Sequence, residues 1–267
     1  MATAGAPASP TPALFDLTGR TALVTGASRG IGWAIARAFG QAGARVTLSS
    51  EDATDCRDAA ARLRDEGIDA TAIACDAGDR AQVQALAERA LAERGRIDVL
   101  VCNAGVPGPS GPLAAAGDAD WERVMTVNLR SALWLSSRLI PAMAERRDGA
   151  VIATASLSAL RGNRSIGLYG ISKAGLAQLV RNLAVEWGPH NVRVNAISPG
   201  VIRTGFARPI VDDHAAAQRR LQQTPLRRFG EPEEIAGVAL MLASRAGGFI
   251  TGQNIVVDGG TTIGDGN

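Results

Sequence analysis

Short apolar strands alternate with helical segments along most of this chain, and this alternation predicts an α/β fold built on a parallel sheet. A glycine-rich turn follows the first expected strand, at the position where doubly wound sheets of this kind hold a nucleotide. The length of 267 residues, 46% of them apolar, is enough for one large domain with a full core. We therefore predict a single doubly wound α/β domain.

The pattern predicts each element in turn. Strands are expected at 20–25, 45–49, 70–74, 97–102, 150–155, 192–198 and 254–257. Helices are expected after the glycine turn and at 53–66, 80–94, 118–142, 169–187 and 231–243. The polar stretch 203–228 has only weak helical character. A long excursion at the carboxyl edge of the sheet is where a substrate loop belongs.

The glycine turn reads Gly26-Ala-Ser-Arg-Gly-Ile-Gly32. Glycines let backbone amides approach a pyrophosphate, and the following helix N-terminus contributes positive potential. The spacing is GxxxGxG and not the generic GxGxxG, so a tight turn without a ligand stays an open alternative. Asn103-Ala-Gly105 ends the fourth expected strand, where such a sheet meets its ligand, although Asn and Gly also form simple turns.

Tyr169 is the only tyrosine of the chain and Lys173 is its only lysine. A separation of four residues places both side chains on one face of a helix. A phenol titrates near pKa ~10, and an adjacent cation favours its anion, so the pair suits acid/base chemistry near neutral pH. The alternative is a half-buried tyrosine beside a solvated lysine, which the uniqueness of both residues disfavours.

Two further polar residues stand at informative places. Asn128 lies on the apolar side of the expected helix 118–142, where a buried amide is either a satisfied core group or part of a hydrated relay. Ser156 follows the fifth expected strand and is either a functional group or a loop former.

Several classes are disfavoured by composition. A net charge of +2 without a basic tract gives no indication of a nucleic-acid partner. The three cysteines are widely spaced and only two histidines accompany them, so neither a disulfide framework nor a metal site is expected. No apolar run approaches the ~18 residues of a membrane span, and residues 1–13 lack the pattern of a leader. We expect a cytoplasmic protein with no membrane partner and a flexible extension at 1–13.

In order and spacing, several motifs resemble the short-chain dehydrogenase/reductases over roughly residues 17–260. They are Thr25-Gly-Ala-Ser-Arg-Gly-Ile-Gly32, Asn103-Ala-Gly105, Asn128, Ser156, Tyr169-xxx-Lys173, Pro199-Gly200 with Thr204, Pro225-Leu-Arg-Arg-Phe-Gly-Glu-Pro-Glu-Glu-Ile-Ala236 and Val257-Asp-Gly-Gly260. The last two resemble 3-oxoacyl-carrier-protein reductases and sugar-alcohol dehydrogenases. Cys102 is a departure, because the family often has asparagine there, and we expect it to alter packing more than chemistry.

The resemblance implies a Rossmann fold with a seven-stranded parallel sheet, a homotetramer, and a catalytic, dinucleotide-binding domain at 14–267 with a substrate loop at about 203–228. It assigns proton transfer to Tyr169, ribose binding and lowering of the tyrosine pKa to Lys173, the substrate oxygen to Ser156, and a water linked to Lys173 to Asn128. The predicted cofactor-binding residues are Gly26, Ser28, Arg29, Gly30, Ile31, Gly32, Ser50, Glu51, Asp76, Ala77, Asn103, Ala104, Gly105, Tyr169, Lys173, Pro199, Gly200, Ile202 and Thr204. No metal is expected.

The resulting prediction is an NAD(P)-dependent oxidoreductase that interconverts a small secondary alcohol and a ketone. Ser50 stands where NAD-type members carry an aspartate, and Arg29 suits the NADP phosphate, whereas the carboxylate of Glu51 would repel it. We lean slightly to NAD. A catalytically silent nucleotide-binding protein, an NADPH-dependent 3-oxoacyl reductase and an epimerase or dehydratase remain alternatives.

The substrate is not predicted, because its determinants lie in the loops 106–117, 157–168 and 203–228. Arginines at 161, 164, 203 and 208 suggest an anionic substrate, but solvated positions are the favoured interpretation in a chain that uses arginine nearly everywhere.

Overall fold

A computed structural model describes residues 13–264 of the chain. Seven strands form one sheet in the order β3-β2-β1-β4-β5-β6-β7, and every neighbouring pair is parallel. The predicted fold class is thereby confirmed. The extension expected at 1–13 lies, apart from Ala13, outside the described residues. The strands are β1 Thr21–Thr25, β2 Arg45–Ser50, β3 Ala70–Ala74, β4 Val99–Cys102, β5 Gly149–Thr154, β6 Val192–Pro199 and β7 Asn254–Val257.

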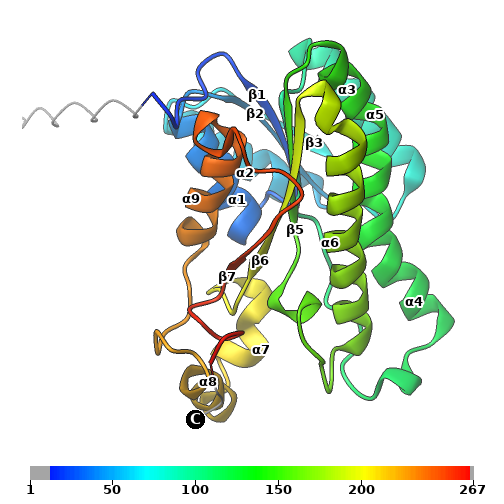
Figure 1. Cartoon of the computed structure of the whole chain (residues 1–267), viewed down its shortest axis with the longest axis vertical. Helices are drawn as coiled ribbons and strands as arrows, with labels where there is room; N and C mark the ends of the chain where they lie inside the picture. Colours follow the sequence, from blue (N-terminus) through cyan, green and yellow to red (C-terminus); the bar gives the residue numbers. More distant parts are fainter. Residues whose placement is uncertain (1–12, 265–267) are drawn as a thin grey trace, which may run out of the picture.

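Helices cover both faces of the sheet (Figure 1). One face carries α1 (Gly30–Gln41), α2 (Ala53–Asp65) and α9 (Pro232–Ala243), and their apolar side chains form one core with that face. The other face carries α3 (Arg80–Arg94), α5 (Ser131–Glu145) and α6 (Gly167–Trp187), which share the second core. Central strands buried on both faces are the reason that β1 and β4 read as continuous apolar runs.

Local capping explains where two helices begin. Asp52 accepts hydrogen bonds from the backbone amides of Thr54 and Asp55 at the start of α2. Asp79 does the same for Ala81 and Gln82 at the start of α3. A cap of this kind stabilises a helix by about 1 kcal/mol, so these two aspartates favour helix starts at the next residue.

The prediction of a single continuous helix at 118–142 is wrong. The structure has α4 (Asp118–Met125), a widened π-helical turn at Thr126–Arg130, and then α5. The wider turn carries Asn128, whose side chain is buried and hydrogen-bonded to backbone outside this helix. Such single-turn irregularities occur frequently at functional sites.

The excursion between β6 and α9 is more helical than predicted. A 3-10 turn at Gly205–Ala207 leads into α7 (Arg208–Val211) and α8 (His214–Gln222), the latter capped by Asp213. These helices lie at the end of the molecule where the strands terminate (Figure 1). The excursion therefore stands at the carboxyl edge of the sheet, as expected for a substrate loop.

Candidate active site

The strand order reverses between β1 and β4, and doubly wound sheets bind their ligands in the crevice at such a point. Asn103, just after β4, donates from Nδ2 to the carbonyl oxygens of Thr25 and Gly26 at 3.1 and 3.0 Å. In return, Thr25 Oγ1 accepts from the backbone amides of Asn103 and Ala104. The two predicted motifs thus hold each other, and Asn103 acts by positioning the glycine turn.

Two glycines of the turn are required by close approach. Gly26 has φ +60°, and a Cβ there would lie 2.9 Å from the Cα of Ala104. A Cβ on Gly32 would lie 2.3 Å from the carbonyl oxygen of Gly26. Only glycine lets α1 begin this close to the turn. No side chain caps the helix start, so its backbone amides can donate to an anionic ligand such as a pyrophosphate.

Other predicted cofactor residues converge on the same crevice. A Cβ at Gly30 would meet the Thr204 side chain at 3.2 Å, so the segment after β6 lies against the glycine turn. A Cβ at Gly105 would meet both Asn128 Oδ1 and Lys173 Nζ at 3.3 Å. The structure therefore joins residues from β1, β4, α6 and the start of the excursion into one site.

The residues predicted to decide between NAD and NADP lie in the glycine turn and at the end of β2. Arg29 pairs with Asp55 at 3.1 Å, and both side chains are largely exposed. Glu51 is exposed and makes no ion pair among residues 13–264. Ser50 Oγ donates to the carbonyl oxygen of Asp52.

Asp76, after β3, folds onto its own turn. Its carboxylate accepts from the Gly78 amide at 2.7 Å, so it shapes the loop that carries Ala77.

Tyr169 and Lys173 lie on one face of α6, as the spacing predicts. Lys173 Nζ is 5.7 Å from the centre of the Tyr169 ring. The ammonium is buried and donates to the carbonyl oxygen of Thr154, the last residue of β5, at 2.7 Å. Burial lowers the pKa of Lys173 to about 8.

The expected lowering of the tyrosine pKa is not what this structure shows. Burial raises the pKa of Tyr169 to about 12, and the neighbouring Ser156 hydroxyl acts in the opposite direction. Desolvation has the larger effect on the phenol because the Lys173 ammonium lies near the ring and is not hydrogen-bonded to the phenol oxygen. The pKa of Lys173 itself is lowered. Activation of the phenol thus requires a further positive charge or hydrogen bond at the site.

Asn128 is a satisfied buried amide. Its Nδ2 donates to the carbonyl oxygen of Val106 and to Ser172 Oγ, and its Oδ1 accepts from the Val106 amide. Ser172 Oγ in turn donates to the carbonyl oxygen of Tyr169 at 2.7 Å. These hydrogen bonds, from Val106 through Asn128 and Ser172 to Tyr169, therefore connect the loop after β4 to the first turn of α6.

Ser156 and an exposed aromatic ring flank the tyrosine. Ser156 Oγ accepts from the Ser158 amide at 3.0 Å, which leaves its own proton free to donate. The Phe206 ring lies 5.9 Å from the Tyr169 ring and reaches it from the excursion. Phe206 is 53% exposed, so it forms an apolar wall beside the phenol.

Sequence reasoning missed Thr154, Ser172, Phe206 and Asp55 as parts of this site. Thr25 belongs to the predicted glycine-rich motif, but that motif does not indicate its hydrogen bonds to Asn103 and Ala104. Ser172 lies inside the Tyr169–Lys173 segment, so its position was available as a signal. The others come close only through the sheet register and the path of the excursion, which no local pattern encodes.

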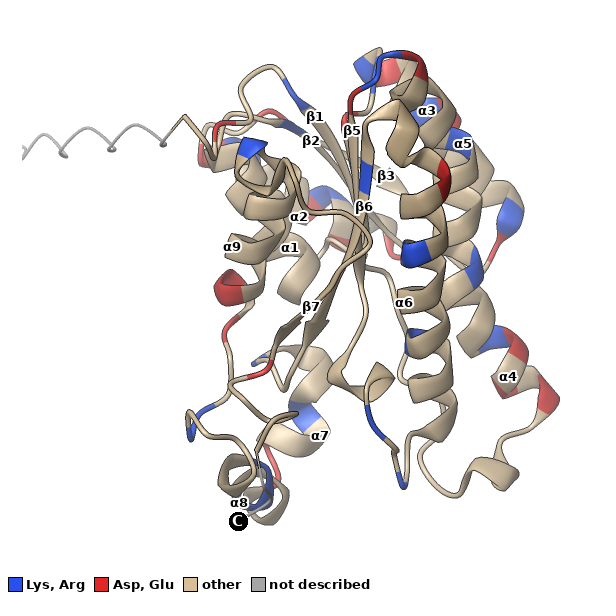
Figure 2. Cartoon of the chain, in the orientation of Figure 1, with Lys and Arg blue, Asp and Glu red and all other residues tan. Residues whose placement is uncertain are grey.

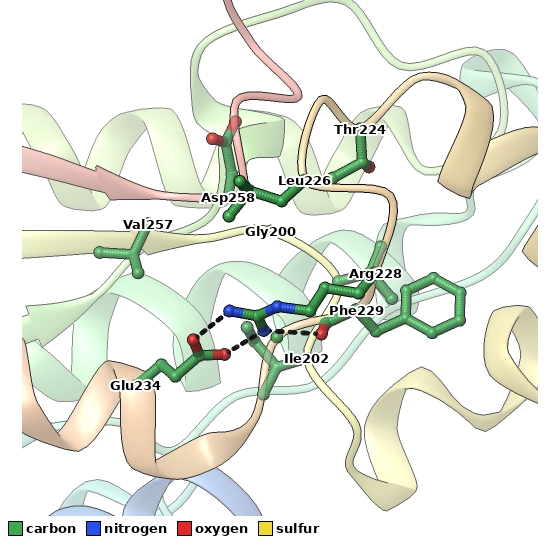
Figure 3. A pocket seen from close by; sticks show the side chains of 12 residues that line it. Gly200, Ile202, Thr224, Leu226, Arg228, Phe229, Glu234, Val257 and Asp258 are labelled. Atoms are coloured by element: carbon green, nitrogen blue, oxygen red, sulfur yellow. Dashed lines mark hydrogen bonds and ion pairs between the residues drawn. The ribbon is translucent and has the colours of Figure 1, made fainter.

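A separate pocket of about 90 Å³ lies beside the site and not at Tyr169 (Figure 3). It shares Gly200 and Ile202 with the predicted cofactor residues. Arg228 closes it by a two-pronged ion pair with Glu234, and the bonded guanidinium lowers the pKa of that carboxyl to about 2. Glu234 also accepts from the Glu231 amide, so this contact fixes the end of the excursion on α9.

Comparison with known proteins agrees with this geometry. Residues 26–262 match the family described as enoyl-(acyl carrier protein) reductase. The 2-dehydro-3-deoxy-D-gluconate 5-dehydrogenase of Formosa agariphila is 37% identical over 94% of this chain and 96% of its own. A gluconate 5-dehydrogenase from Burkholderia cenocepacia, solved with NADP and tartrate, has TM-score 0.90 and 34% identity over 94% and 98% of the two chains.

A 7α-hydroxysteroid dehydrogenase solved with NADH and 7-oxo glycochenodeoxycholic acid has TM-score 0.89 and 36% identity over 92% of this chain and 96% of its own. The chain belongs to the short-chain dehydrogenase/reductase superfamily. It is an NAD(P)-dependent oxidoreductase acting on an alcohol and the corresponding ketone, as predicted. Within residues 13–264, no helix has the length and apolar character needed to cross a bilayer.

Proposed function

We propose that residues 14–267 form one catalytic domain in which Tyr169 transfers the hydroxyl proton of a secondary alcohol substrate. Ser156 holds the substrate oxygen by donating its free hydroxyl proton, and this donation stabilises negative charge that develops on that oxygen. Lys173 binds the nicotinamide ribose and keeps a positive charge near the phenol. Asn128 fixes the first turn of α6, and the second lone pair of its Oδ1 holds a water linked to Lys173.

The observation that carries this proposal is the buried Lys173 ammonium beside Tyr169, with one backbone acceptor. A buried cation without an acidic partner is costly unless a ligand compensates it. A nicotinamide dinucleotide fits, because the bare glycine turn suits its pyrophosphate and its ribose hydroxyls suit Lys173. When bound, this cofactor supplies the hydride acceptor. The predicted cofactor residues of β1, β4, β6 and α6 hold it in the crevice.

We favour NAD over NADP on local charge. Arg29, the group best suited to a ribose phosphate, is paired with Asp55, and Glu51, directly after β2, is exposed and makes no ion pair among the described residues. A phosphate dianion would have to displace one carboxylate and approach another, whereas a ribose hydroxyl can donate to Glu51. The exposed ion pair is weak, so the preference is expected to be moderate.

We also propose a cytoplasmic homotetramer. Exposed apolar side chains lie on the outward faces of α5 and α6, with Leu133 41%, Ile171 38% and Val185 81% exposed. Phe249, before the edge strand β7, and Val256, within it, are 105% and 39% exposed. Two separate apolar faces suit two kinds of two-fold interface. Sedimentation of a monomer at micromolar concentration contradicts this assembly.

A substrate screen tests the proposed function. The purified chain is assayed with NAD and with NADP against polyols, hydroxy acids, hydroxysteroids and 3-oxoacyl thioesters, following nicotinamide absorbance. Polyhydroxy acids come first, because two relatives carry gluconate in their names. Turnover of a secondary alcohol or ketone supports the proposal. Tight nicotinamide binding without turnover of any class supports the catalytically silent alternative instead.

A further inference from the structure

Each loop around the candidate site exposes a large apolar side chain. Leu113 lies in the loop after β4, Leu160 in the loop after β5, and Phe206 in the excursion, and each is about half exposed. These are the three loops in which the sequence predicts the substrate determinants. Large apolar side chains left exposed at a candidate site indicate that the site binds an apolar surface.

Phe206 lies directly beside the phenol of Tyr169. The two ring centres are 5.9 Å apart, and the ring planes are tilted by 43°. A substrate oxygen that exchanges a proton with Tyr169 has to come within hydrogen-bond distance of the phenol. The groups on the carbon that carries this oxygen then meet the Phe206 ring. A hydroxyl pressed against that ring loses hydrogen bonds to water, whereas an apolar group gains by leaving water.

The loop after β4 adds an apolar wall at the start of α6. The backbone amide of Gly111 donates to the carbonyl oxygen of Ser165, just before α6, at 2.8 Å. A Cβ on Gly167, in the first turn of this helix, would lie 3.3 Å from the Leu113 side chain. Residues 106–117 include no charged side chain, and one serine hydroxyl is their only polar side-chain group (Figure 2). This wall offers almost nothing to a polar substrate.

The arginines of the other two loops differ in their surroundings. Arg203 pairs with Glu231 at 3.2 Å, so its charge is already used. Arg164 and Arg208 are exposed, which agrees with solvated positions. Arg161 is half-buried, and a carboxylate bound by this side chain is the alternative that the test has to distinguish.

We propose that the substrate is a secondary alcohol, or the corresponding ketone, whose reacting carbon carries an apolar ring or alkyl chain that packs on Phe206. This inference rests on the proposed function and selects one substrate class from its screen. A polyhydroxy acid needs a polar partner for each of its hydroxyls, and these loops supply few. An apolar substituent also displaces water from the Phe206 ring and so from the neighbouring phenol.

The test compares three six-membered rings of different polarity, which are cyclohexanol, myo-inositol and 4-hydroxycyclohexanecarboxylate. Their oxidation by the full-length protein is followed with NAD and with NADP by nicotinamide absorbance. We expect kcat/KM for cyclohexanol to exceed that for myo-inositol by about ten-fold or more. In a series from 2-butanol to 2-octanol, kcat/KM should rise by up to about four-fold for each added methylene, the factor for one fully buried methylene.

Phe206→Ala should reduce kcat/KM for 2-octanol by about ten-fold, mainly through KM, because the longer chain loses its apolar contact. The value for 2-butanol should change less. Phe206→Leu keeps an apolar side chain and should retain most of the gain with chain length. Leu226→Ala is the control, since Leu226 is an exposed apolar residue of the same excursion that lines the separate pocket and not the surroundings of Tyr169.

A kcat/KM for myo-inositol equal to or above that for cyclohexanol overturns the inference, as does an unchanged value for 2-octanol in Phe206→Ala. A preference for 4-hydroxycyclohexanecarboxylate over cyclohexanol also overturns it, and Arg161→Gln then shows whether that side chain binds the carboxylate.

Binding separates this inference from the proposed function. Saturation-transfer NMR with the protein and NADH ranks the three rings even if none of them is turned over. Preferred binding of cyclohexanol that Phe206→Ala abolishes supports the inference, while the missing turnover counts against the proposed function. Equal saturation transfer to cyclohexanol and myo-inositol overturns the inference and leaves the proposed function to the wider screen.

Discussion

At the amino edge of the sheet the carboxylate of Asp98 is fully buried and contacts three arginines, whereas at the carboxyl edge the buried ammonium of Lys173 has only a backbone acceptor. Asp98 Oδ1 lies 2.6 Å from Arg96, 3.7 Å from Arg146 and 4.0 Å from Arg20. Its Oδ2 accepts from the Thr21 amide at 2.9 Å. The negative charge of Asp98 is thus balanced by side chains of the protein itself.

Arg94 repeats the pattern at the amino edge. Its nearly buried guanidinium pairs with Asp69 at 2.8 Å and donates to Val46 O, Thr47 Oγ1 and Thr71 Oγ1. At the carboxyl edge, Lys173 has no acidic partner among the described residues and donates only to the carbonyl oxygen of Thr154. The comparison indicates that charged side chains paired within the protein stabilise the fold, whereas a charged side chain without an ionic partner is available to a ligand. Five changes test this contrast.

The largest expected effect is on turnover in Tyr169→Phe. This change removes the proton donor and leaves packing intact, so we expect a loss on the order of 10³-fold in kcat. NADH affinity, measured by fluorescence titration, should stay within a few-fold. Substantial turnover in this variant would exclude Tyr169 as the acid/base group.

Lys173→Arg should also lose most activity and, unlike Tyr169→Phe, weaken cofactor binding. The larger planar group cannot take the place of a compact ammonium in a site that is 3% exposed. The Kd for NADH should rise by about ten-fold or more, and circular dichroism checks that the variant is folded. Normal kinetics would show that a specific point charge is not needed here.

Asp98→Asn should damage stability and spare catalysis. Removing one partner from a buried ionic cluster costs about 3 kcal/mol in the free energy of unfolding. Urea unfolding followed by tryptophan fluorescence measures the loss, and kcat below the transition should match the wild type. A variant that stays equally stable but loses activity would contradict the division between the two edges.

The pH dependence of stability should show the cost of Lys173. Its pKa is about 8 in the folded chain and 10.5 without burial, so the unfolded chain holds more protons between these values. The contribution of this lysine to stability therefore rises as pH increases from 8 to about 10. Lys173→Met should be more stable than the wild type at pH 7, and its advantage should shrink over that range. A constant difference across pH would show that the buried ammonium carries no such cost.

Glu51→Arg should have the smallest effect, on cofactor choice. Replacing this exposed carboxylate with a guanidinium should raise kcat/KM for NADP relative to NAD by about ten-fold. Glu51→Gln serves as the control and should shift the ratio by less. A wild-type kcat/KM for NADP that is ten-fold above that for NAD contradicts our preference for NAD.

The sequence by itself determined the order of strands and helices and the face shared by Tyr169 and Lys173. Both follow from local periodicity, because a period of two or 3.6 residues reports which side of an element is buried. The helix starts expected at 53 and 80 agree with α2 and α3, where the structure shows Asp52 and Asp79 as caps. The sequence also placed Ser156 just after β5, since the apolar run before Ser156 has the length of a strand.

Tertiary structure alone decided two other features. The π-helical turn at Thr126–Arg130 exists together with the contacts of Asn128 to Val106 and Ser172, which lie 22 and 44 residues away. The direction of the Tyr169 pKa shift depends on burial of the phenol, which acts against the Ser156 hydroxyl 13 residues earlier in the sequence. Desolvation and charge–charge contact act through space, so they are set by how the elements pack and not by the order of residues in any one of them.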